Sequence, residues 1–109
     1  MLPHEFILDH LYPLPIQTKK MFGNHGIYVE DKIVLAVRDN ENKPIDNGIW
    51  IATSAKHHDR LKSQFSSLKN LTLYNIKKWL LLPVESEDFE ERAIEICELI
   101  KSGDPRIGV

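Results

Sequence analysis

The residue types with the most reactive side chains in this chain are five histidines and a single cysteine, Cys97. The histidines are densest at His57-His58-Asp59, where imidazole and carboxylate groups could bind a metal ion. Adjacent helical side chains point about 100° apart, whereas helical zinc motifs place two histidines four residues apart on one face. We therefore interpret His58 as a histidine at the edge of the core and His57 as a solvated one, and we expect no metal site.

Cys97 falls on the apolar face of a predicted helix, without a base or an anion-stabilising group in its sequence context. We interpret it as a small apolar core residue rather than a nucleophile. The glutamate-rich residues 85–98 are typical of a solvated helical surface and not of a paired-carboxylate site. No serine-hydrolase or redox signature is present, so the sequence predicts a non-enzymatic protein with no cofactor.

Length and composition narrow the class of protein. A chain of 109 residues with 42% apolar residues suits one domain, residues 1–109. The 14 basic and 16 acidic side chains nearly cancel to a net charge of -2, which removes the overall positive charge of a dedicated nucleic-acid binder. One cysteine cannot form an intramolecular disulfide, no signal peptide is apparent, and the longest apolar stretch, residues 79–82, is far too short for a membrane span. We therefore expect a cytoplasmic protein with no membrane contact.

The apolar spacing predicts helices at both ends of the chain and strands between them. The expected elements are a helix that starts near Pro3 and ends before Pro13, strands at 19–22, 27–30, 33–38 and 49–53, a helix from Ser54 to about Phe65, a strand at 76–82, and a final helix capped by Ser86 or Asp88 that ends at Gly103. Residues 71–74 are a weaker strand candidate. Asp31-Lys32 is expected as a turn, and residues 40–48 as an exposed loop.

The resulting order is α-β-β-β-β-α-β-α. The connections between the first strands are too short for parallel crossovers, and no regular βαβ alternation appears. The sequence therefore predicts an α+β fold of two layers, an antiparallel sheet with helices packed on it.

Two glycines three residues apart mark the first hairpin. Gly23 and Gly26 flank Asn24-His25, so the chain can turn there and pair residues 21–22 with residues 27–28. A phosphate-binding loop is the alternative, but a P-loop needs a Gly-Lys-Ser/Thr entering a helix, and here a strand follows. We expect a hairpin.

The same segment resembles the N-terminal domain of the TfoX/Sxy competence-regulator family. The residues that carry the resemblance are Lys19, Lys20, Met21, Phe22, Gly23, Gly26 and Tyr28. The resemblance implies an antiparallel sheet with helices packed on it, in a short single-domain member. Lys19 stands where the family motif usually has arginine, and Asn24-His25 replaces a glycine and an aromatic or small residue. The full-length regulators have a second domain without a counterpart in this chain, so their role in competence is not carried over.

Charge is distributed unevenly along the chain. Residues 54–80 hold six basic side chains against Asp59, whereas residues 85–98 hold seven acids against Arg92. This bipolar pattern favours electrostatic docking to a protein partner. Local nucleic-acid binding is the alternative, since aromatic residues lie among the basic ones, although Phe65 and Trp79 also fit core positions. The basic residues that could contact nucleic acid or a partner are Lys56, Arg60, Lys62, Lys77 and Lys78.

The sequence therefore favours a regulatory domain that acts through contact with an unidentified protein partner. Two alternatives stay open: nucleic-acid binding through the basic residues, and a small-molecule site or enzyme with a pocket near His25, Tyr28 and Trp50. Homodimerisation also stays open, because an open sheet leaves edges that a second copy could cover.

Overall fold

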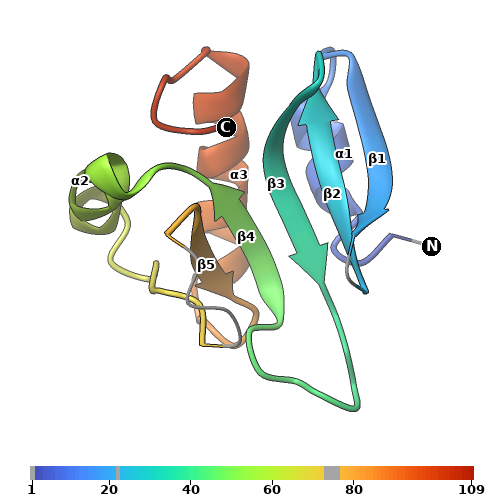
Figure 1. Ribbon diagram of the computed structural model, residues 1–109, viewed down its shortest axis with the longest axis vertical. Helices are drawn as coiled ribbons and strands as arrows, with labels where there is room; N and C mark the ends of the chain where they lie inside the picture. Colours follow the sequence, from blue (N-terminus) through green and yellow to red (C-terminus); the bar gives the residue numbers. More distant parts are fainter. Residues whose placement is uncertain (1, 22, 73–76) are drawn as a thin grey trace.

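The computed structural model describes residues 2–21, 23–72 and 77–109 of the chain. Five strands form one antiparallel sheet in which each strand pairs with the next along the sequence (Figure 1). The elements are α1 (Phe6–Leu11), β1 (Ile16–Met21), β2 (Asn24–Val29), β3 (Lys32–Arg38), β4 (Gly48–Ala52), η1 (Ala55–His57), α2 (His58–Gln64), β5 (Trp79–Pro83) and α3 (Phe89–Lys101). The predicted α+β class and element order are confirmed.

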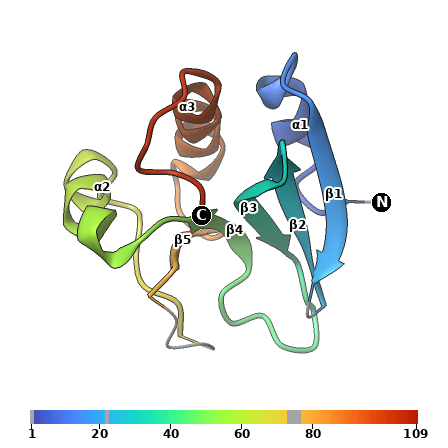
Figure 2. The same cartoon turned by 45° about the horizontal axis from the view of Figure 1, so that its top comes forward.

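The main core lies between the sheet and a layer formed by α1 and α3, which pack against each other (Figures 1 and 2). The apolar face predicted for the last helix is the buried one. It consists of Phe89, Ala93, Ile96, Cys97 and Ile100. Leu35, Ile51 and Leu82 meet this layer from three adjacent strands, and each is almost fully buried.

The opposite face of the sheet has a second, smaller core. The rings of Trp50 and Trp79 meet edge to face at 5.8 Å, and Leu71 from the connection before β5 packs with them. The Trp50 indole N–H donates to the Asp46 carbonyl at 2.9 Å, so its one polar atom is bonded. Because β4 and β5 are buried on both faces, their sequences are continuous apolar runs rather than alternating ones.

The first hairpin forms, but its register differs from the expected one. Met21 pairs with Asn24 and Lys19 with Gly26, so Gly26 is inside β2 and not in the turn. Gly23 supplies the positive φ of the turn, at +80°. Gly26 instead lies under the Tyr28 ring: a Cβ there would stand 3.2 Å from Tyr28 Cε1. The second glycine therefore makes room for the Tyr28 ring of the same strand and for the Ile33 side chain of β3.

Other boundaries are also corrected. β1 begins at Ile16, three residues before the predicted strand. The turn after β2 consists of Glu30 and Asp31, both with positive φ (49° and 70°), and Lys32 already belongs to β3. This geometry suits a two-residue hairpin turn, for which asparagine and glycine are the usual residues.

The predicted helix starts are approximate. A short 3₁₀ turn precedes α2, and the Ser54 side chain makes no capping hydrogen bond. The Asp88 side chain does not cap α3 either, because it accepts hydrogen bonds from the hydroxyls of Ser67 and Ser86, each at 2.7 Å. These bonds, Ser67 foremost, lower the pKa of Asp88. Phe22, Ile76 and half of the weaker strand candidate at 71–74 (residues 73 and 74) lie outside the described residues.

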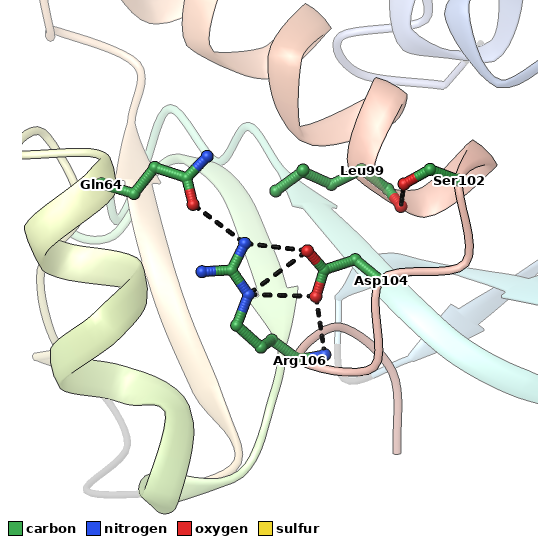
Figure 3. A network of polar contacts seen from close by, with 5 residues as sticks. All are labelled: Gln64, Leu99, Ser102, Asp104 and Arg106. Atoms are coloured by element: carbon green, nitrogen blue, oxygen red, sulfur yellow. Dashed lines mark hydrogen bonds and ion pairs between the residues drawn. The ribbon is translucent and has the colours of Figure 1, made fainter.

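The C-terminal tail closes a gap in the sheet. Strands β3 and β4 diverge at one end, and the tail lies between them (Figure 1), where the Gly108 N–H donates to the Ala52 carbonyl at 2.7 Å and the Val109 N–H donates to the Ile33 carbonyl at 3.1 Å. Arg106 links the tail to α2 by donating to Gln64 Oε1 at 2.9 Å (Figure 3). Within the tail, Arg106 also donates to Asp104 Oδ2 at 2.8 Å. The Arg106 hydrogen bond lowers the pKa of Asp104.

Candidate interaction surfaces

The motif residues at the first hairpin contact one another. The Lys19 ammonium lies 4.9 Å from the centre of the Tyr28 ring, a cation–π contact across the strand pair. With Gly26 beneath the ring, the three residues form one layered unit on this face of the sheet. These contacts explain the residue types of the motif by their packing in the hairpin, and the explanation needs no bound ligand.

The outer edge of β1 is open. β1 is the first strand of the sheet and pairs only with β2, and its residues from Gln17 to Lys20 are exposed. The strand pair nearest a two-residue turn is hydrogen-bonded, and bonded pairs alternate with non-bonded ones along an antiparallel ladder. Since Met21 is paired with Asn24, the backbone groups of Met21 and Lys19 point into the sheet. Those of Thr18 and Lys20 therefore point outward.

The opposite edge of the sheet is covered. Lys69 exchanges two backbone hydrogen bonds with Leu81 on the outer side of β5, at 2.7 and 3.0 Å. Within the described part of the chain, no such segment reaches the outer side of β1. Described segments therefore cover the edge of β5 and the gap between β3 and β4, whereas none covers the outer edge of β1.

A buried arginine, which the sequence analysis did not single out, joins the hairpin to the loop before β4. Arg38 is 4% exposed and donates to the Asn24 side-chain oxygen at 3.3 Å, to the Ile45 carbonyl at 3.1 Å and to the Lys43 carbonyl at 2.9 Å. It forms no ion pair with any described residue. The expected exposed loop at 40–48 is consequently exposed only in part, because Asp46 and Asn47 are buried. An arginine at the end of an apolar strand was the only sequence signal.

The five basic residues predicted as a contact set are placed on two neighbouring segments. Lys56 belongs to η1, Arg60 and Lys62 to α2, and Lys77 and Lys78 lead into β5. The segments meet where the Thr53 N–H donates to the Lys78 carbonyl at 2.8 Å. All but Lys62 are exposed; Lys62 is half-buried and donates to the Asn70 side chain. None of the five is ion-paired with a described residue, whereas Lys69, Arg92, Lys101 and Arg106 all are.

The candidate catalytic and metal-binding residues are not brought together. Cys97 is fully buried and its thiol faces the Ile7 carbonyl at 3.8 Å; burial raises the pKa of Cys97 to about 12, so the reactive thiolate is suppressed. Among the residues that the structure describes, no three His, Cys, Asp or Glu side chains are grouped in a way that could hold a metal ion. His58 is 8% exposed, as expected of a histidine at the edge of the core.

His58 makes the stability of the fold sensitive to acid. Burial, aided by the positive charge of Lys62, lowers the pKa of His58 below 6.5, and the opposing effects of Asp59 and the Thr53 backbone are smaller. The unfolded chain therefore binds a proton more readily than the folded one. The stabilisation from neutral His58 is complete above its unfolded pKa and is lost as the pH falls from 6.5 toward the folded value.

We expect the urea midpoint of the wild type to fall more than that of His58→Leu between about pH 7.5 and about pH 5.5. The comparison between the two proteins removes the contribution of the other four histidines. Equal falls in the two midpoints would show that His58 titrates as it does in the unfolded chain.

Two open hollows lie near the hairpin tip and the start of α3. The first has about 340 Å³, and Tyr28 and the buried Trp50 are not among its lining residues, which are Lys20, Met21, Gly23, Asn24 and His25. The second has about 570 Å³; it is lined by the rings of His4, Phe6 and Phe89 and by acidic residues that include Glu90. His4 and Ser86 both line the second hollow, but the Ser86 hydroxyl donates to Asp88 and His4 Nε2 lies 3.3 Å from the Arg38 carbonyl oxygen, so each is bonded elsewhere.

Comparisons with known proteins give no family assignment. The chain matches no family model, no curated protein and no solved structure. In the described ranges, no helix combines the length and apolar character needed to cross a membrane. The resemblance to the TfoX N-terminal domain therefore depends on the motif residues alone.

Proposed function

We propose that this chain is a non-enzymatic, cytoplasmic interaction domain of regulatory type, related to the TfoX N-terminal domain, and that it binds a protein partner along the open edge of β1. The observation that supports the proposal is the uncovered edge itself. Outward N–H and C=O groups can pair with an added strand, which is the basis of peptide recognition by β-augmentation. Exposed strand edges that have no partner are a liability that most proteins cover.

The charge of the edge selects the occupant. Lys19 and Lys20 are the only charged residues of β1, and neither is ion-paired with a described residue. Pairing of two β1 strands from separate copies would bring like charges close together, which destabilises a strand pair and protects the edge against self-association. An extended segment rich in Asp or Glu from another protein complements the edge instead.

The first test is a selection from a random peptide library displayed on phage, with the whole chain immobilised. We expect enriched peptides to be acidic relative to the starting library. Synthetic copies should protect the β1 amides from hydrogen exchange. No enrichment, or enriched peptides without acidic character, would contradict the proposal.

A substitution pair at Thr18 tests the binding element. Thr18→Pro removes an N–H that points away from the sheet, and edge strands tolerate proline at such a position. The substitution should lower the affinity for the selected peptides about tenfold or more, because it removes a backbone hydrogen bond and hinders strand addition. Thr18→Val keeps the N–H and should bind as the wild type does. Equal binding of the two variants would place the peptides elsewhere, and turnover of a metabolite by the purified chain would refute the non-enzymatic proposal.

A further inference from the structure

The largest group of uncompensated charges lies away from β1, on the α2 basic surface, which we define as Lys56, Arg60, Lys62, Lys77 and Lys78. α2 stands at one end of the sheet, and the segment that leads into β5 returns beside it (Figures 1 and 2). Asp59 belongs to α2 itself, and the Asp104 carboxylate of the C-terminal tail is bonded to Arg106. The seven acids of residues 85–98 belong mostly to α3, a separate element.

We propose that the α2 basic surface binds the phosphate backbone of a nucleic-acid duplex. Phosphates recur at regular intervals along a duplex and are recognised by lysine and arginine without a fitted pocket. Four of the five cations are exposed, and none has a carboxylate partner within the described residues. Binding to phosphates would therefore break no ion pair.

Burial of the apolar residues here argues against the two competing ligands. An interface between side chains, unlike strand addition at a sheet edge, takes most of its binding energy from a few anchors such as aromatic residues, but Leu61, Phe65 and Trp79 are 1%, 4% and 8% exposed. The same burial removes Phe65 and Trp79 as rings on which an unpaired base could stack, which single-strand binders use. The expected ligand is thus a duplex, contacted through its backbone and without base specificity.

The number of cations sets the expected strength. Each phosphate neutralised contributes about -0.9 to the slope of log K against log salt, so contacts from the four exposed cations give a slope of about -4. The affinity should then fall about 250-fold between about 50 and 200 mM salt.

The experiment is a fluorescence-anisotropy titration of a labelled DNA duplex with the whole chain over that salt range. Lys56→Gln combined with Lys78→Gln should make the slope less steep by about 2, because two phosphate contacts are lost. Lys43→Gln is the matched control: Lys43 is exposed, forms no ion pair with a described residue and lies in the loop before β4, so removal of its charge should leave the slope unchanged. Circular dichroism checks that each variant is folded.

Polyglutamate distinguishes a duplex from an acidic protein. We expect unlabelled duplex to displace the probe at least about tenfold more effectively than polyglutamate of equal charge concentration. No binding at about 50 mM salt, an unchanged slope in the double variant, or equal displacement by polyglutamate would each overturn the proposal. The β1 variant Thr18→Pro should bind duplex normally, so this test is independent of the proposed protein-binding edge.

Discussion

Gly48→Ala is expected to prevent the chain from reaching its native fold. Gly48 begins β4 with φ at +141°, a backbone conformation that residues with a Cβ rarely adopt. A Cβ at this position would stand 2.2 Å from the Leu82 carbonyl oxygen and 2.9 Å from the Val84 amide nitrogen. Both are backbone atoms, so no rotamer change can relieve the clash. We expect a loss of more than about 4 kcal/mol, which is comparable to the whole stability of many small domains.

Gly23→Ala is the matched control for Gly48→Ala. Gly23 also has a positive φ, at +80°, but a Cβ there would meet no atom within 4 Å apart from its chain neighbours. Its substitution should cost only about 1–2 kcal/mol of backbone strain. Soluble yield, circular dichroism and urea unfolding of the two variants measure the difference. Equal losses would mean that strain alone acts at both positions and that the close approach of β5 to Gly48 is not a constraint.

The sequence is sufficient to predict the order and type of the elements, but not the register of the first hairpin. Gly23 and Gly26 both permit a turn, and the local spacing does not distinguish them. Side-chain contacts of the hairpin residues decide between them. The Tyr28 ring lies over Gly26, and the Asn24 side chain accepts a hydrogen bond from Arg38. Both contacts require Asn24 and Gly26 to be inside β2.

The candidate surfaces were predictable to different degrees. The α2 basic surface is visible in the sequence because its residues belong to two charged segments, although only the Thr53–Lys78 hydrogen bond shows that the segments meet. The open edge of β1 is not visible. The sequence does not show which openings of the sheet other segments cover. Lys69 covers the edge of β5, and the C-terminal tail fills the gap between β3 and β4. Such coverage comes from backbone contacts that carry no residue-type signal.

Arg38→Ala is expected to cost about 3–5 kcal/mol of stability, because each buried acceptor left without a donor costs about 1–3 kcal/mol. The substitution leaves the Ile45 and Lys43 carbonyls and the Asn24 side-chain oxygen without their donor in a largely buried site. Arg38→Lys keeps the charge, but an ammonium group cannot reproduce three divergent donors of a planar guanidinium, so we expect an intermediate loss. Urea unfolding gives the magnitudes. Hydrogen exchange should show faster exchange in residues 40–47 for both variants.

The same substitution tests whether the loop and the hairpin are one unit. The Asn24 amide nitrogen is buried and has no partner among the described residues, so the side chain depends on Arg38 for its only hydrogen bond. If Arg38 couples the two segments, Arg38→Ala combined with Asn24→Ala should lose at least about 0.5 kcal/mol less than the sum of the single losses. Additive losses would show that Arg38 stabilises the loop alone. The stability of the β1–β2 hairpin would then not depend on the polar contacts that Arg38 makes with the loop before β4.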